Sequence, residues 1–124
     1  MRVLHQRSTY FCATILLATV LSTSTTHAFF SDYGPRPQKW CGWQMRKEVW
    51  RDPGPAYNRA IEWKRYGSAA SGPAVGVIVV WPHHVGKIVG RDESGNWVVR
   101  SGNDGGELRE RARSLRGVVA YRWP

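Results

Sequence analysis

Hydrophobic residues in the first part of the chain recur at helical spacing. Between Cys41 and about Trp50 the apolar side chains lie roughly three or four residues apart, and the proline-containing segment 51–55 ends this helix. A second helix is predicted over 56–67, because Tyr57 begins an i, i+3, i+4, i+7 series and the final glycine can cap the C-terminus. Two short helices are therefore expected.

After residue 74 the pattern changes to short runs rich in β-branched and aromatic residues, which is typical of strands. The break at 91–95 contains Glu-Ser-Gly and suits a hairpin turn. The expected strands are Val75–Trp81, Val85–Gly90, Asn96–Ser101 and Gly117–Trp123. Helices followed by an antiparallel meander predict the α+β class, in one domain over 39–124.

The first 28 residues have the composition of a secretory signal. Two arginines precede the apolar run Phe11–Leu21, and a small residue, Ala28, occupies the expected cleavage position. The 11-residue run is too short for a transmembrane helix, which needs about 20 residues. Cleavage after Ala28 is therefore predicted, with 29–38 as an extended lead-in. The mature protein is expected to be secreted or periplasmic, without a transmembrane anchor.

Cleavage would leave Cys41 as the one cysteine of the mature chain, together with the histidines His83 and His84. An odd cysteine in an exported protein is either an intermolecular partner or a free reactive thiol. The mature chain carries 16 Lys and Arg against 9 Asp and Glu, a net charge of +7. This charge favours contact with anionic cell-wall polymer, lipid or nucleic acid, or it serves solubility alone.

The predicted position of Cys41, in the first turn of a helix, favours a nucleophilic thiolate. Free backbone N–H groups there stabilise negative charge and can also hold an oxyanion, and the pKa of Cys41 is expected to fall below about 8.5. A thiolate of this kind needs an imidazole, and His83 and His84 open the second strand. The imidazole needs a polar partner. The end of the neighbouring strand offers Ser101, Asn103 and Asp104.

Four segments carry a more specific pattern over nearly all of 39–124: "KWCGWQM", "GVIVVWPHHVGKIVG", "WVVRSGND" and "RGVVAYRWP". In this order they resemble the CHAP-like branch of the NlpC/P60 superfamily of papain-like cysteine hydrolases. The resemblance implies a small papain-like fold with N-terminal helices packed on an antiparallel sheet. It also implies hydrolysis of an amide bond in peptidoglycan. A monomer without a cofactor is expected.

The resemblance implies a role for three residues. Cys41 would be the nucleophile, His84 the base and Asn103 the residue that orients the base. The chain departs from the family pattern at Gly76–Val77, where Gly-Asp is usual, and at Ser101, where many members carry an acidic residue. Gln38 is a further candidate, as a donor to the oxyanion.

Two other interpretations of these residues remain open. A metal site would need Cys41, His83 and His84 together, but adjacent histidines on a strand diverge and no second cysteine completes a tetrahedral set. The second is a non-catalytic, cationic envelope protein that binds anionic cell-wall polymer or lipid. Specific nucleic-acid binding is not expected.

The seven tryptophans are better explained by a core and a groove than by a stacking platform for bases. Trp50, Trp63 and Trp81 lie in predicted elements and are expected to be buried. Trp40 and Trp43 flank Cys41 and are expected to line a substrate cleft. A basic run, expected to be a solvated connection, contains Arg109, Arg111, Arg113 and Arg116.

Overall fold

The structure, a computed structural model, describes residues 32–124, so the predicted signal sequence and cleavage site lie outside it. Within these residues no helix is both long and apolar enough to cross a membrane. The helical elements are α1 (Cys41–Arg46) and two 3-10 helices, η1 (Pro55–Asn58) and η2 (Ala60–Arg65). The strands are β1 (Ser68–Ala69), β2 (Ile78–Trp81), β3 (His84–Arg91), β4 (Trp97–Asp104), β5 (Glu107–Ala112) and β6 (Ala120–Trp123).

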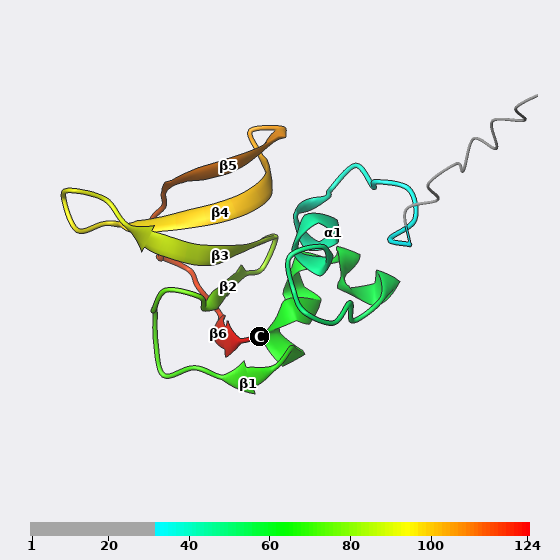
Figure 1. Ribbon diagram of the computed structural model, residues 1–124, viewed down its shortest axis with the longest axis horizontal. Helices are drawn as coiled ribbons and strands as arrows, with labels where there is room; N and C mark the ends of the chain where they lie inside the picture. The colour runs from blue at the N-terminus through cyan, green and yellow to red at the C-terminus, as the bar shows by residue number, and fades with distance from the viewer. Residues whose placement is uncertain (1–31) are drawn as a thin grey trace, which may run out of the picture.

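The strands form one six-stranded antiparallel sheet in the order β1-β6-β2-β3-β4-β5. The short helices gather beside the end of the sheet where β3 begins and β4 ends (Figure 1). This arrangement confirms the predicted α+β class. It also brings the first residue of α1 next to the first residues of β3, although more than 40 residues separate them in the chain.

Both faces of the sheet are covered by apolar side chains. On the helix side, Met45 and Trp63 pack with Val80 and Val85, and all four are buried. On the opposite side the core is formed by Val79, Trp81, Ile88 and Val99, with Leu115, Val118 and Tyr121 packed against it. Burial on both faces explains why β2 is a continuous apolar run rather than an alternating one.

A polar residue just after α1 fastens that helix to the sheet. Glu48 accepts a hydrogen bond from the guanidinium of Arg100 in β4 at 3.0 Å, and its backbone carbonyl accepts one from Lys87 in β3 at 3.5 Å. Gln44 donates to the same Glu48 carboxylate at 2.8 Å. These bonds fix the position of α1, and therefore of Cys41, relative to both strands.

The two predicted helices are shorter and differently wound than expected. The first ends at Arg46. The buried guanidinium of Arg46 binds both carboxylate oxygens of Asp52 at 2.7 Å, so the segment between them folds back toward α1 instead of continuing the helix. The second is divided into η1 and η2 by Arg59, whose backbone is extended. An added Cβ at Gly42 would lie 2.3 Å from the Tyr57 carbonyl oxygen, which shows how closely α1 packs against η1. This packing overrides the helical periodicity of residues 56–67.

The basic run predicted as a connection contains the edge strand β5. Its six residues are all exposed, so the alternation that normally reveals a strand is missing. The pair Gly105 and Gly106, both at positive φ, makes the tight turn that joins β4 to β5. That glycine pair was the signal available in the sequence. The two-residue strand β1 was not predicted either.

Burial of the tryptophans agrees with the sequence only in part. Trp63 is completely buried and Trp81 is 9% exposed, as expected. The expectation for Trp50 was wrong, because α1 ends before it and the side chain is fully exposed.

Candidate active site

Cys41 is the first residue of α1 and lies in the helix-side core, as the sequence predicted for its place in the chain. Its side chain is 4% exposed. The sulfur is 4.0 Å from the backbone carbonyl oxygen of His83, to which the thiol donates. The backbone N–H groups of Val85, Gly42 and Cys41 itself also face the sulfur. The thiol therefore touches the main chain on both sides of His84.

Burial raises the pKa of the Cys41 thiol, which overturns the expectation of a lowered pKa. The three backbone N–H groups and the positive charge of Arg113 lower the pKa, but they are weaker than the cost of removing a thiolate from water. Sequence spacing located the helix start but could not show how deeply the sulfur would be buried. In the resting protein Cys41 is a neutral thiol.

His84 is the first residue of β3 and pairs with Trp81 at the end of β2. The two ring centroids are 5.8 Å apart. Burial, followed by the charge of Arg113, lowers the pKa of His84 from 6.5 to about 4, while Asp104 acts in the opposite direction. His84 is therefore neutral at pH 7, so the resting site holds a thiol and a neutral imidazole rather than a thiolate–imidazolium ion pair.

Side chains alternate along β3, and this alternation separates Cys41 from the His84 ring. The Val85 side chain packs with Cys41 in the helix-side core. The His84 side chain lies on the opposite face of the sheet, beside Trp81. Within residues 32–124 no hydrogen bond joins the sulfur to the imidazole. The structure brings Cys41 against the backbone on both sides of His84, while the His84 ring lies beside Trp81.

Asn103 lies beyond the last residue pair of β3 with β4. In that pair Lys87 faces Arg100, so His84 and Asn103 each lie three residues further along their own strand toward the same end of the sheet. Asn103 has φ +53°, a left-handed conformation that asparagine adopts more readily than most residues. It lies where the β4–β5 register shifts.

Two polar groups near this point are buried without a partner. Among the described residues, His84 Nε2 and Ser101 Oγ are the buried side-chain nitrogen and oxygen atoms that make no hydrogen bond. Ser101 is 2% exposed and lies on the same face of β4 as Val99. An unpaired imidazole nitrogen is costly to bury, which points to a partner that engages it in the working protein.

Asp104 is the third polar residue at the end of β4, and it is held by arginines rather than by His84. Its buried carboxylate binds Arg111 of β5, with Nε to Oδ2 at 2.7 Å, and lies 3.4 Å from the guanidinium of Arg113. The hydrogen bond from Arg111 lowers the pKa of Asp104. Asp104 therefore acts on His84 through its charge only.

Arg113 was missed as a member of the site, since the basic run was expected to be solvated. Its guanidinium lies 5.1 Å from the centroid of Trp81, which in turn neighbours His84. The same charge lowers the pKa of both Cys41 and His84. The spacing of Arg109, Arg111 and Arg113 at every second residue was the available signal, because such spacing is typical of one face of a strand, although β5 itself ends at Ala112.

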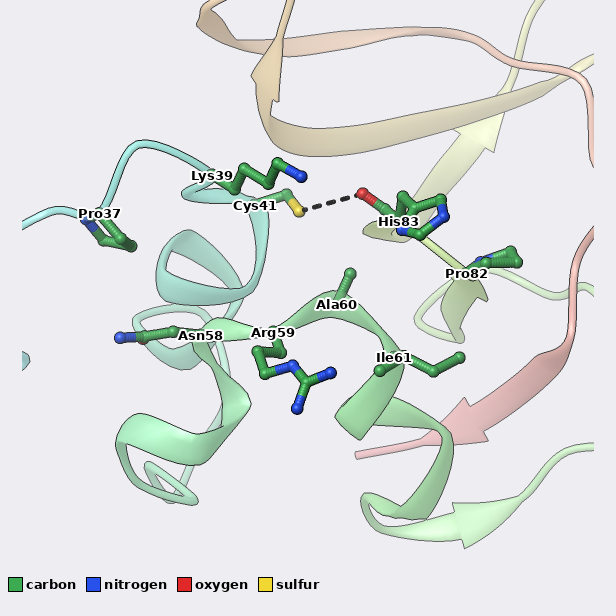
Figure 2. A pocket seen from close by; sticks show the side chains of 9 residues that line it. All are labelled: Pro37, Lys39, Cys41, Asn58, Arg59, Ala60, Ile61, Pro82 and His83. Carbon is green, nitrogen blue, oxygen red and sulfur yellow. Dashed lines mark hydrogen bonds between the residues drawn. The ribbon is translucent and has the colours of Figure 1, made fainter.

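A cleft of about 650 Å³ opens beside Cys41 (Figure 2). It lies between the segment before α1, the junction of η1 with η2, and the turn that joins β2 to β3. Its lining residues are Pro37, Lys39, Cys41, Asn58, Arg59, Ala60, Ile61, Pro82 and His83. His83 is exposed and contributes its side chain to the wall of the cleft, and its backbone carbonyl accepts the hydrogen bond from the Cys41 thiol.

Three residues predicted near the cleft lie elsewhere. Neither Trp40 nor Trp43 belongs to the lining. Trp40 is buried against β4, where an added Cβ on Gly102 would lie 2.7 Å from its ring, and Trp43 donates to the Gly34 carbonyl at 3.2 Å. Gln38 is exposed and also lies outside the lining.

Within residues 32–124 no group of three or more His, Cys, Asp or Glu side chains is placed to hold a metal ion. The chain matches no protein-family model, no curated protein and no solved structure.

Proposed function

We propose that the protein is an exported cysteine hydrolase with a papain-like fold, in the CHAP-like branch of the NlpC/P60 superfamily, that cuts an amide bond in peptidoglycan. One observation carries the proposal. The sulfur of Cys41, at the start of a helix, lies against the carbonyl of His83 and the N–H of Val85, beside an open cleft. A thiol and space for a substrate thus lie beside the backbone of His84, the residue that carries the candidate imidazole.

In the proposed reaction, proton transfer accompanies bond formation, because Cys41 and His84 are both neutral at rest. His84 takes the thiol proton while the sulfur attacks the amide carbonyl, and backbone N–H groups around the sulfur stabilise the oxyanion. His84 then protonates the leaving amine, and a thioester remains. Water, deprotonated by His84, attacks the thioester, which releases the carboxylic acid and restores the thiol.

Asn103 is the proposed orienting residue. It lies three residues beyond Arg100, as His84 lies three residues beyond its partner Lys87, and His84 Nε2 is buried without a partner. A hydrogen bond from Nε2–H to the Asn103 amide oxygen would satisfy that nitrogen and raise the basicity of the ring. It would also turn Nδ1 toward the thiol, as the base in such a triad requires.

The test is the dependence of peptidoglycan cleavage on the thiol. Purified sacculi are incubated with the wild-type protein and with Cys41→Ala, and soluble muropeptides and sacculus binding are both measured. The proposal expects release by the wild type, loss of release in Cys41→Ala, and nearly equal binding by both. Several peptidoglycan types are needed, because the cleaved bond is unspecified.

A second candidate, a non-catalytic cationic envelope protein, is favoured by the burial of Cys41 and its raised pKa. Such a protein would bind sacculi through its positive charge and release nothing. Wild-type protein that binds every sacculus type without releasing muropeptides would overturn the proposed hydrolase in favour of this candidate. Binding that disappears at high salt would assign the affinity to charge.

A further inference from the structure

We infer that the cleft selects peptides that carry a carboxylate near the cleaved bond, and that Lys39 and Arg59 recognise it. The inference rests on the proposed function for the role of Cys41, and it names the chemistry of the substrate. Lys39 comes from the segment just before α1 and Arg59 from the junction of η1 and η2. The two cations thus stand on different walls of the cleft, with Cys41 on its lining as well (Figure 2).

Both cations are free to bind a ligand. Within residues 32–124 neither side chain makes an ion pair, a side-chain hydrogen bond or a cation–π contact, and both are exposed. Most other arginines of the domain are engaged, as Arg46 is with Asp52 and Arg111 with Asp104. The lining contains no aspartate or glutamate that could neutralise Lys39 or Arg59. The cleft is therefore electropositive without an internal counter-charge.

The rest of the lining limits the kind of anion that fits. Pro37, Ala60, Ile61 and Pro82 present apolar surface around the thiol, which suits the aliphatic parts of a peptide. Two separated cations match isolated carboxylates better than the continuous phosphate row of a nucleic acid, which needs a track of basic residues. A short peptide with free carboxyl groups has both the apolar and the anionic parts that this lining can bind.

The experiment compares one substrate in two charge states. Soluble muropeptides are prepared with free carboxylates, and a second portion is converted to the amides with carbodiimide and ammonia, which keeps size and shape. The kcat/KM of both forms is measured for the wild type, Lys39→Gln, Arg59→Gln and the double variant. Lys64→Gln, an exposed cation of η2 outside the lining, is the matched control.

The wild type is expected to prefer the free-acid form about threefold to tenfold, as suits two exposed charge contacts. The preference should shrink in each single variant, approach one in the double variant and stay unchanged in Lys64→Gln. Added salt should weaken it. A preference that survives in the double variant, or equal cleavage of both forms by the wild type, overturns the inference and leaves the proposed hydrolase standing.

Calorimetric binding of the same two preparations separates this inference from the proposed function. If neither form is cleaved but the acid form binds more tightly through Lys39 and Arg59, the hydrolase proposal fails and the carboxylate site stands. If neither form is cleaved and both bind equally well, or neither binds, the carboxylate site fails as well.

Discussion

The thiol of Cys41 donates to the backbone carbonyl of His83, with sulfur and oxygen 4.0 Å apart. The turn that carries this carbonyl also carries His84 into β3. A contact between a helix start and the turn before β3 thus holds the candidate nucleophile against the backbone next to the candidate base. The sulfur is buried there, and this burial raises the pKa of the thiol.

Alkylation of Cys41 by iodoacetamide is expected to be slow until the pH exceeds the pKa of an ordinary thiol. Burial raises the pKa of Cys41, and only the thiolate reacts. The labelling rate is measured from pH 5 to 10 on native protein, with urea-denatured protein as the reference. Because His84 is already neutral, His84→Ala should change the profile little. Fast labelling of native protein at mildly acidic pH would show instead that an ion pair exists.

The folded state is expected to lose stability as the pH falls from 6.5 toward 4. The pKa of His84 is about 4 in the folded protein and 6.5 in the unfolded chain, so the unfolded chain binds this proton first. The stabilisation is complete above pH 6.5. We expect the free energy of unfolding to fall by up to about 2 kcal/mol between pH 6.5 and pH 4, after allowing for solvent screening. Urea titrations at pH 4.5 and 7 measure it, and His84→Gln should lose part of the difference. An equal pH dependence in that variant would exclude His84 as the cause.

Alanine substitutions at Asn103 and Ser101 are expected to lower turnover to very different extents. Asn103→Ala removes the proposed partner of His84 Nε2, and kcat should fall about tenfold to a hundredfold with little change in KM. Ser101→Ala removes a hydroxyl that has no hydrogen-bond partner, so its effect should be small. Muropeptide release at saturating substrate is the measurement. The reverse order of effects would transfer the orienting role to Ser101.

Gly102→Ala is expected to displace α1 and lower both stability and activity. The new Cβ would lie 2.5 Å from the Gln44 side chain and 2.7 Å from the Trp40 ring, which flank Cys41. Overpacking of this kind costs about 1–3 kcal/mol. Gly72→Ala is the control, because nothing lies within 4 Å of the added carbon there. Equal unfolding midpoints for the two variants would contradict the close packing between β4 and α1.

Asp52→Asn is expected to cost about 3 kcal/mol, because it leaves the guanidinium of Arg46 buried without its counter-charge. Arg46 is 2% exposed and also donates to the Tyr33 carbonyl and to Asn58, so the pair joins the lead-in, α1 and η1. Chemical denaturation measures the loss. The control Glu93→Gln, on an exposed turn residue, should change stability by less than about 0.5 kcal/mol.

The sequence predicted the parts of the fold that depend on local apolar pattern. The strands β2, β3, β4 and β6 were anticipated because each has a β-branched or aromatic run, although their bounds shifted by a few residues. The edge strand β5 was not anticipated, because strand pairing rather than burial holds its exposed residues in place. The η1–η2 segment was read as one helix, because its division depends on contact with Gly42.

For the candidate site, the sequence placed Cys41 at a helix start and His84 at a strand start, and the structure agrees. It could not anticipate the ionisation of either residue, because that depends on how α1 and the sheet together exclude water from the sulfur and the ring. The charge of Arg113 reaches both groups only through the folding of β5 and the segment after it.

The burial of Cys41 has a consequence if the protein is exported, as proposed. Compartments that receive exported proteins are oxidising, and a free thiol there is open to sulfenic acid formation and to mixed disulfides. Both reactions need a thiolate that oxidants can reach. Cys41 is only 4% exposed, so oxidants reach it poorly, and its raised pKa leaves little of it as thiolate. The packing that makes the resting thiol a poor nucleophile therefore also preserves it in the reduced form.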